Sequence, residues 1–133
     1  MSQVNVELTY LASDAFNRRD LEAFLALADP ETEAFTRIME LEGGGPYRGH
    51  QGVRNWWKDV LEIAPDLRHE IEEVRDIGDL TVARIRQHGR GVGSDAPMEQ
   101  TQWIITKWRD KKAVWWRILV SEAEALEAAR LKE

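Results

Sequence analysis

The sequence predicts one α+β domain in which helices pack into a strongly curved mixed or antiparallel sheet, forming a cone with an apolar pocket. Two observations support this fold class. Three helical segments, with one strand inserted among them, precede a meander of long strands and a terminal helix. The chain has 133 residues, of which 43% are hydrophobic and 32% charged, as is typical of one globular domain. We therefore expect a single domain over residues 1–133.

The helices are predicted from apolar residues that recur at steps of three and four. Asp20 is a favourable N-cap for the second helix, and Pro30 shows that this helix has ended. The segment Ser121-Glu122-Ala123-Glu124 is a capping box, with Ser121 as the N-cap of the last helix. The expected helices cover about residues 4–16, 21–29, 50–64 and 121–131.

The strands are predicted from alternating apolar and polar residues that are bounded by turn-forming residues. Gly78-Asp79 and residues 109–112 are typical of tight turns. The run Gly43-Gly44-Gly45-Pro46 indicates a break, and residues 89–97 indicate a glycine-rich loop. The expected strands cover about residues 34–41, 67–77, 80–88, 98–108 and 113–120.

Side-chain alternation assigns the faces of the last three strands. One face of the final strand is entirely apolar, and we expect that face to line the pocket. On the strand over residues 80–88, Arg84 and Arg86 then lie outside, near Glu70 and Glu72. The residues expected to face inward are Ala83, Ile85, Gln87, Gln100, Gln102, Ile104, Thr106, Val114, Trp116, Ile118 and Val120.

The outward face of the same strands predicts a homodimer that forms back to back through the sheet. Tryptophan and arginine together are found at interfaces more often than in contact with solvent. A monomer would leave two indoles and a leucine exposed on one face, which usually marks an interface. The residues of this expected interface are Arg84, Arg86, Trp103, Trp115, Arg117 and Leu119.

Composition excludes several classes of function. The formal net charge of −6 argues against nucleic acid and against an anionic membrane surface as partners. The chain has no cysteine, so disulfides, thiolate metal sites and a cysteine nucleophile are excluded. No apolar run approaches the roughly 20 residues of a membrane span, and residues 1–7 lack the pattern of a signal peptide. We expect a cytoplasmic protein.

Four stretches in order along the chain resemble the SnoaL-like family of the nuclear-transport-factor-2-like superfamily. The first three are Asp20-Leu21-Glu22-Ala23-Phe24, then Tyr47-Arg48-Gly49-His50-Gln51-Gly52-Val53 running into Trp56, then the turn Ile77-Gly78-Asp79. The fourth is Ser121-Glu122-Ala123-Glu124-Ala125-Leu126-Glu127-Ala128-Ala129. The resemblance implies a cone of curved sheet around helices, with a pocket at its open end.

The resemblance does not imply one function, because relatives include polyketide cyclases, a steroid isomerase, an epoxide hydrolase, a dehydratase and non-catalytic binding proteins. By alignment, Ala12 and Ile104 stand where the steroid isomerase has its tyrosine and its protonated aspartate, and its basic aspartate falls at or beside Phe35. Its catalytic set is therefore missing. Arg84 or Arg86 would supply the cation of the epoxide hydrolase, but neighbouring strand positions offer no matching acids.

His69 is the candidate catalytic residue, as a general base oriented by Glu73 on the same strand. The alternative is a hydrogen-bonded histidine with a structural role, and for His50 we expect capping or packing. The three histidines are too dispersed for a metal site, so we expect no metal and no cofactor.

The expected partner is a small apolar or aromatic molecule. Gln100 and Gln102 are expected either to orient a carbonyl or hydroxyl of this ligand or to satisfy each other. The residues expected to line the ligand pocket are Phe16, Phe35, Tyr47, Trp56, Gln87, Gln100, Gln102, Ile104, Trp116 and Ile118.

Three functions stay open at this point. The first is a pocket protein that binds this small molecule. The second is a proton-transfer enzyme of the cyclase, isomerase or dehydratase type. The third is a non-catalytic dimeric interaction module.

Overall fold

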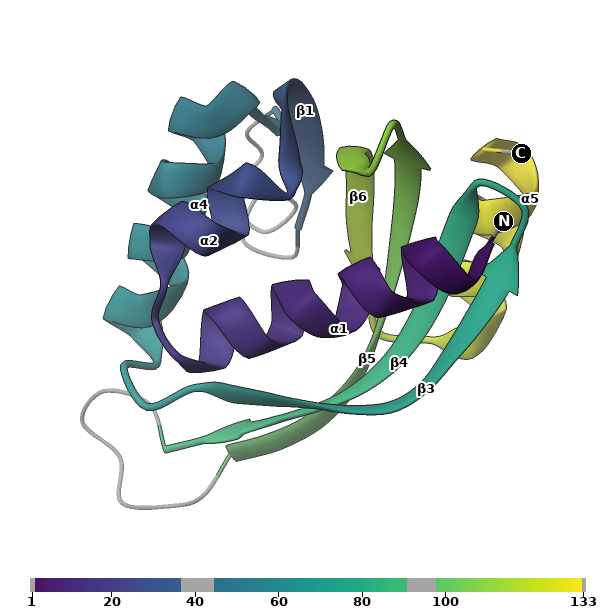
Figure 1. The fold of residues 1–133 in the computed structure, drawn as a ribbon. Helices are drawn as coiled ribbons and strands as arrows, with labels where there is room; N and C mark the ends of the chain where they lie inside the picture. Colours follow the sequence, from purple (N-terminus) through teal and green to yellow (C-terminus); the bar gives the residue numbers. More distant parts are fainter. Residues whose placement is uncertain (1, 37–44, 91–97, 133) are drawn as a thin grey trace.

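The computed structural model describes residues 2–36, 45–90 and 98–132, which form the predicted α+β domain (Figure 1). Three helices and two strands come first along the chain. Four further strands then form an antiparallel meander, and a final helix follows. The helices are α1 (Ser2–Asn17), α2 (Leu21–Ala26), α4 (Gly49–Ile63) and α5 (Glu122–Lys132). The strands are β1 (Ala28–Phe35), β2 (Tyr47–Arg48), β3 (Arg68–Ile77), β4 (Leu80–Gly89), β5 (Met98–Arg109) and β6 (Lys112–Leu119).

The described strands form one mixed, open sheet in the order β2-β1-β6-β5-β4-β3. Only the pairing of β1 with β6 is parallel among these strands, and the other pairs are antiparallel. The fold class predicted from the sequence is therefore confirmed. Figure 1 shows β3, β4 and β5 bending across the molecule beneath α1, which gives the sheet its strong curvature.

The first strand begins earlier than predicted. The sequence analysis placed it over residues 34–41, whereas β1 starts at Ala28 and contains Pro30. A proline has no backbone N–H to donate to a neighbouring strand. It is tolerated here because the pairing of β1 with β6 is irregular between Ala28 and Glu33. Residues 37–41 of the predicted strand, Gly43-Gly44 of the predicted break and residues 91–97 of the predicted loop lie outside the described residues.

The predicted side-chain orientation is confirmed on β4 and β5 and for Glu70 on β3, before the strand's bulge between Ile71 and Glu73. Arg84 Nε lies 3.3 Å from Glu72 Oε1, and Arg86 Nη2 lies 2.7 Å from Glu70 Oε1, on the outer face of the sheet. The tight turn predicted between β5 and β6 is also present. Asp110 and Lys111 both have positive φ angles, of 53° and 65°, as a two-residue hairpin turn requires.

Two apolar clusters lie on opposite faces of the sheet. The inner face packs against α1, α2 and α4, and the outer face packs against α5. The inner cluster contains Phe16, Leu25, Ala34, Val53, Trp56, Trp57, Ala64, Leu67, Trp116 and Ile118. The outer cluster contains Leu80, Val82, Ile105, Trp115, Leu119, Ala125 and Ala129.

The outer cluster changes the basis of the homodimer prediction. Trp115 and Leu119 were expected to be exposed on a monomer, but they are only 9% and 4% exposed because α5 and Phe35 cover them. Trp103 is half-buried at the edge of the same cluster. The predicted outward orientation of these residues is therefore confirmed, but the predicted exposure of Trp115 and Leu119 is wrong. The homodimer itself stays a prediction.

Helix caps follow the sequence. The Asp20 side chain accepts a hydrogen bond from the Ala23 backbone N–H at 3.0 Å, and the Ser121 hydroxyl accepts one from Glu124 at 3.3 Å. Both bonds satisfy backbone groups that the first turn of a helix leaves unpaired. In the part of the chain that the structure describes, no helix is both long enough and apolar enough to cross a membrane.

Candidate functional site

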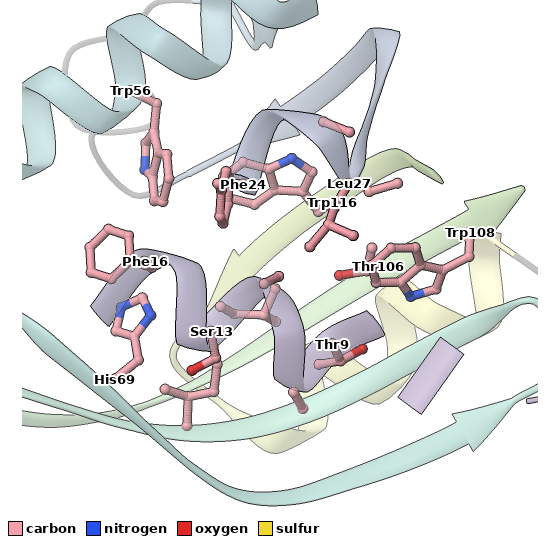
Figure 2. A pocket seen from close by; sticks show the side chains of 16 residues that line it. Thr9, Ser13, Phe16, Phe24, Leu27, Trp56, His69, Thr106, Trp108 and Trp116 are labelled. Atoms are coloured by element: carbon pink, nitrogen blue, oxygen red, sulfur yellow. The ribbon is translucent and has the colours of Figure 1, made fainter. Parts of the chain in front are cut away.

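A cavity lies between the inner face of the sheet and the helices α1, α2 and α4. With its open mouth included, it measures about 680 Å³, and about 80 Å³ of this is space in which a water-sized sphere can sit. Figure 2 shows His69, Phe16 and Trp56 at one end and Thr9, Thr106 and Trp108 at the other. The inner cavity is lined by Thr9, Ala12, Ser13, Phe16, Phe24, Leu27, Ala28, Trp56, His69, Ala83, Ile85, Ile104, Thr106, Trp108, Ala113 and Trp116.

Aromatic rings from four elements form one wall of the cavity. The ring centroids of Trp56 and Trp116 are 4.8 Å apart in an edge-to-face arrangement. Phe24 lies 5.8 Å from Trp56, and Phe16 lies 5.9 Å from the same indole. Such contacts between offset or tilted rings are favourable and hold each ring in one orientation. The wall is therefore a preformed apolar surface.

His69 is held at one end of the cavity by Asn17, the last residue of α1. The Asn17 side chain donates to the His69 carbonyl at 2.8 Å and accepts from the His69 backbone N–H at 2.9 Å. These two bonds tie the edge strand β3 to α1, as a neighbouring strand would. They bring the imidazole against Phe16, with ring centroids 4.5 Å apart and planes only 9° from parallel.

Burial lowers the pKa of His69 from 6.5 to about 4, because the charged imidazolium would lose its hydration in this apolar site. The positive charge of Arg19 lowers this pKa further, and His88 contributes in the same direction. A hydrogen bond with the side chain of Gln87, opposite His69 on β4, acts in the other direction and raises this pKa. At neutral pH the imidazole is therefore uncharged and has a partner on one nitrogen.

The prediction that Glu73 orients His69 is wrong. Straight alternation along β3 would place both side chains on one face, but the strand has a bulge between Ile71 and Glu73. The additional residue reverses the alternation, so Glu73 pairs with Arg84 and lies on the outer face. There its Oε1 accepts a hydrogen bond from Arg75 Nε at 3.0 Å.

Thr9 and Trp108, at the end of the cavity away from His69, have hydrogen-bond partners (Figure 2). Trp108 Nε1 donates to the Thr81 hydroxyl at 3.0 Å, and the Thr81 and Thr9 hydroxyl oxygens are 3.2 Å apart. Thr9 in turn donates to the Asn5 carbonyl at 2.8 Å. This chain of bonds satisfies buried polar atoms and fixes the Trp108 ring against the cavity.

Of the residues predicted to line a ligand pocket, Phe16, Trp56, Ile104 and Trp116 line the cavity. Ile118 belongs to the inner cluster, but it packs beside the cavity and does not line it. Phe35 lies on the outer face, 6.0 Å from Trp115, because its neighbour Ala34 takes the inner position opposite Trp116.

The polar residues of the prediction lie elsewhere. Tyr47 donates its hydroxyl to Asp59 at 3.0 Å and packs at the start of α4. Gln100 is exposed, and its side chain accepts a hydrogen bond from the buried Gln102 at 3.3 Å. The two glutamines therefore satisfy each other, which was one of the two expectations. Gln87 does not line the cavity but contacts the imidazole that does.

The sequence analysis missed the two polar residues of α1 that line the cavity, Thr9 and Ser13. Thr9, Ala12, Ser13 and Phe16 recur at helical spacing and all line the cavity. The apolar residues Val4 and Leu11 of the same helix are instead 39% and 53% exposed. A stripe of small polar residues one position away from the apolar residues was the signal available in the sequence. His50, by contrast, has the predicted packing role, since its Nε2 lies 2.8 Å from the Ala28 carbonyl.

The comparisons with known proteins identify the family. The profile of the SnoaL-like domain matches residues 9–116, and the chain belongs to this family. A comparison with curated protein sequences gave no significant match. Within the described residues, no three histidine, aspartate or glutamate side chains come together as ligands for a metal ion.

Solved structures of the same fold cover nearly the whole chain. An NTF2-like protein of unknown function from Burkholderia pseudomallei has a TM-score of 0.80 at 21% identity, over 93% of this chain and 95% of its own. TerC, co-crystallised with polyporic acid, has a TM-score of 0.79 at 21% identity, over 93% and 96% of the two chains. IdmH, a putative polyketide cyclase from Streptomyces antibioticus, has a TM-score of 0.76 at 22% identity, over 94% and 97%.

Proposed function

We propose that this protein binds one small apolar or aromatic molecule in the inner cavity. The observation that carries the proposal is the preformed wall of Phe16, Phe24, Trp56 and Trp116 around empty space. Ligand sites in proteins are mostly apolar concave surfaces of about 300–1,000 Å³ with a few polar groups that orient the ligand. The inner cavity has this composition, and its space of about 80 Å³ for a water-sized sphere is smaller than such a site and fits a small ligand.

The family supports the same proposal. TerC has the same fold and was co-crystallised with polyporic acid, and IdmH has the same fold and is described as a putative polyketide cyclase. The space that a water-sized sphere can enter, about 80 Å³, favours a ligand with one ring over a large polycyclic one.

Titration of the purified protein with toluene tests the proposal, with tryptophan fluorescence and calorimetry as readouts. We expect saturable binding, with a change in emission because Trp56 and Trp116 lie in the cavity wall. In Ala12→Leu the added side chain occupies cavity space, and we expect the affinity to fall at least tenfold. Leu11→Ser is the control, since Leu11 is on the same helix but 53% exposed. Absence of saturable binding, or equal binding by Ala12→Leu, would refute the proposal.

A second candidate function is proton transfer, and the position of His69 favours it. The imidazole lines the cavity and is uncharged at neutral pH, so it has a ring nitrogen able to accept a proton. The test is exchange of the α-hydrogens of 2-indanone in D₂O, followed by NMR. Wild-type protein should accelerate this exchange and His69→Phe should not. Equal rates would remove the catalytic role.

A further inference from the structure

We infer that Asn17 and Arg19, at the C-terminal end of α1, are positioning residues that keep the imidazole of His69 inside the inner cavity. This inference rests on the proposed function, because it assigns to two residues outside the cavity wall the placement of the titratable group that lines it. Four hydrogen bonds, one strained backbone position and the packing of one aromatic ring support it.

The first observation is that alternate backbone carbonyls of the segment entering β3 are bound by the end of α1. Arg19 Nη2 donates to the Pro65 carbonyl at 3.0 Å and to the Leu67 carbonyl at 2.6 Å. Asn17 continues the series two residues later, since it donates to the His69 carbonyl at 2.8 Å and accepts from the His69 N–H at 2.9 Å. β3 lies at an edge of the described sheet, with β4 on one side. On the other side, the two side chains supply the hydrogen bonds that a neighbouring strand would give this segment.

The second observation is the backbone of Arg19, which has a positive φ of 61°. Its N–H donates to the Phe16 carbonyl at 3.0 Å, and the Asp20 N–H donates to the Ala15 carbonyl at 2.9 Å. These two bonds form a helix ending whose left-handed residue is usually glycine, because a side chain is unfavourable there. An arginine at this position is therefore strained, and the strain indicates that its guanidinium has a role that glycine could not fill.

The third observation is that the same guanidinium packs on the ring against which the imidazole stacks. Arg19 Cζ lies 5.0 Å from the centroid of the Phe16 ring, and Arg19 Nη1 donates to the Phe16 carbonyl at 2.9 Å. Phe16 is 1% exposed, and its ring stacks on the imidazole with centroids 4.5 Å apart (Figure 2). Arg19 therefore fixes both members of the stack, because it binds the backbone of Phe16 and the segment that leads to His69.

Loss of these contacts should move the imidazole without removing the cavity. The other rings of the aromatic wall, Phe24, Trp56 and Trp116, belong to α2, α4 and β6. Once released from α1, the start of β3 is paired on one side, and His69 separates from Phe16. The expected result is a cavity that still binds an apolar ring but has lost His69 from its wall.

NMR measures the position of the imidazole through the ring-current shift that Phe16 imposes on the C–H signals of the His69 ring. Spectra are recorded at pH 8, where the imidazole is neutral in every variant. Phe16→Leu identifies this shift in the wild-type spectrum. In Arg19→Gly and in Asn17→Leu, we expect at least half of the shift to be lost.

Two features of the variants separate positioning from general stability. Arg19→Gly removes the guanidinium and also relieves the strained backbone, so its urea midpoint should stay near that of wild type. Arg18→Ala is the matched control, because Arg18 is the adjacent arginine but is 53% exposed and bonds to the exposed carboxylates of Asp14 and Asp20. This control should keep the wild-type shift.

Binding and catalysis give a second readout, which a merely structural role would not divide. In Arg19→Gly the affinity for toluene should stay within about twofold of wild type, whereas exchange of 2-indanone should slow about tenfold or more, because only the base is misplaced. If both variants keep the wild-type shift, the inference is wrong and the proposed function stands. Loss of toluene binding together with the shift in Arg19→Gly would also overturn it, because Arg19 would then support the whole cavity. If wild type itself does not bind toluene, the proposed function fails, and the NMR shift still decides the inference.

Discussion

The two faces of the sheet are built from the same strands, yet one encloses a cavity and the other is solid. On the inner face, large rings from α1, α2 and α4 meet edge to face and leave space between them. On the outer face, α5 presents Ala125 and Ala129, which are at most 1% exposed, against Ile105 and Leu119. The cleft beside α5 has no space for a water molecule.

The difference shows that the size of the covering side chains, more than their hydrophobicity, decides whether a sheet face leaves a cavity. Small residues at i and i+4 of a helix allow its backbone to approach the sheet closely. Bulky aromatic residues keep the helices apart, and their flat shapes do not fill the remaining volume.

The largest expected effect concerns the solid face. Trp115→Glu should lower the free energy of unfolding by about 3–5 kcal/mol, because it places an unpaired charge beneath α5. Urea denaturation measures this loss. Because Trp115 is buried, this variant would disturb the fold and cannot test the homodimer by itself. A variant as stable as wild type would mean that α5 does not cover this tryptophan in solution. Light scattering on wild type tests the dimer directly.

The imidazole of the cavity should give the protein a specific pH dependence. The pKa of His69 is about 4 when folded and near 6.5 when unfolded, so protons bind more readily to the unfolded chain. The stabilisation is complete above pH 6.5 and is lost as the pH falls toward 4, by about 3 kcal/mol in total. Urea denaturation from pH 7 to 4.5 should show this additional slope in wild type and not in His69→Phe. If the stability of wild type and of His69→Phe depended on pH in the same way, His69 would be exposed to solvent in the folded protein.

A matched pair of substitutions compares the two faces directly. Ala125→Leu should cost about 1–3 kcal/mol, because the outer cluster has no room for three more carbon atoms. Ala12→Leu makes the same change on α1, where the side chain points into empty space, and should change stability by less than about 0.5 kcal/mol. Thermal or urea unfolding gives both values. Equal costs would mean that the cavity is closed in solution.

The smallest expected effects concern the caps of the helices on each face. Asp20→Ala and Ser121→Ala should each cost about 1 kcal/mol, because each removes the acceptor for a backbone N–H in the first helical turn. Ser121→Asp should retain wild-type stability, since aspartate is an equally good N-cap. Urea unfolding checks all three variants. A stable Ser121→Ala protein would indicate that packing of Ala125 and Ala129 alone fixes α5.

By itself the sequence determined the features that depend on local period and local chemistry. Alternation placed Arg84 and Arg86 beside Glu72 and Glu70, and helical spacing placed Trp56 on the inner face. The N-caps and the two-residue turn were also predictable, because each depends on a few residues close together in the chain.

Only the tertiary structure decided which of the residues predicted to face inward line the cavity. It also decided which side chain contacts the imidazole of His69. The bulge in β3 depends on pairing with β4, so no local pattern showed that Glu73 would turn outward and leave Gln87 as the partner of the imidazole. In the same way, Trp115 is buried only because α5 returns to the sheet after the last strand. The alternation of side chains along a strand determines which face of the sheet a residue lies on, whereas packing between distant segments determines which side chains it contacts there.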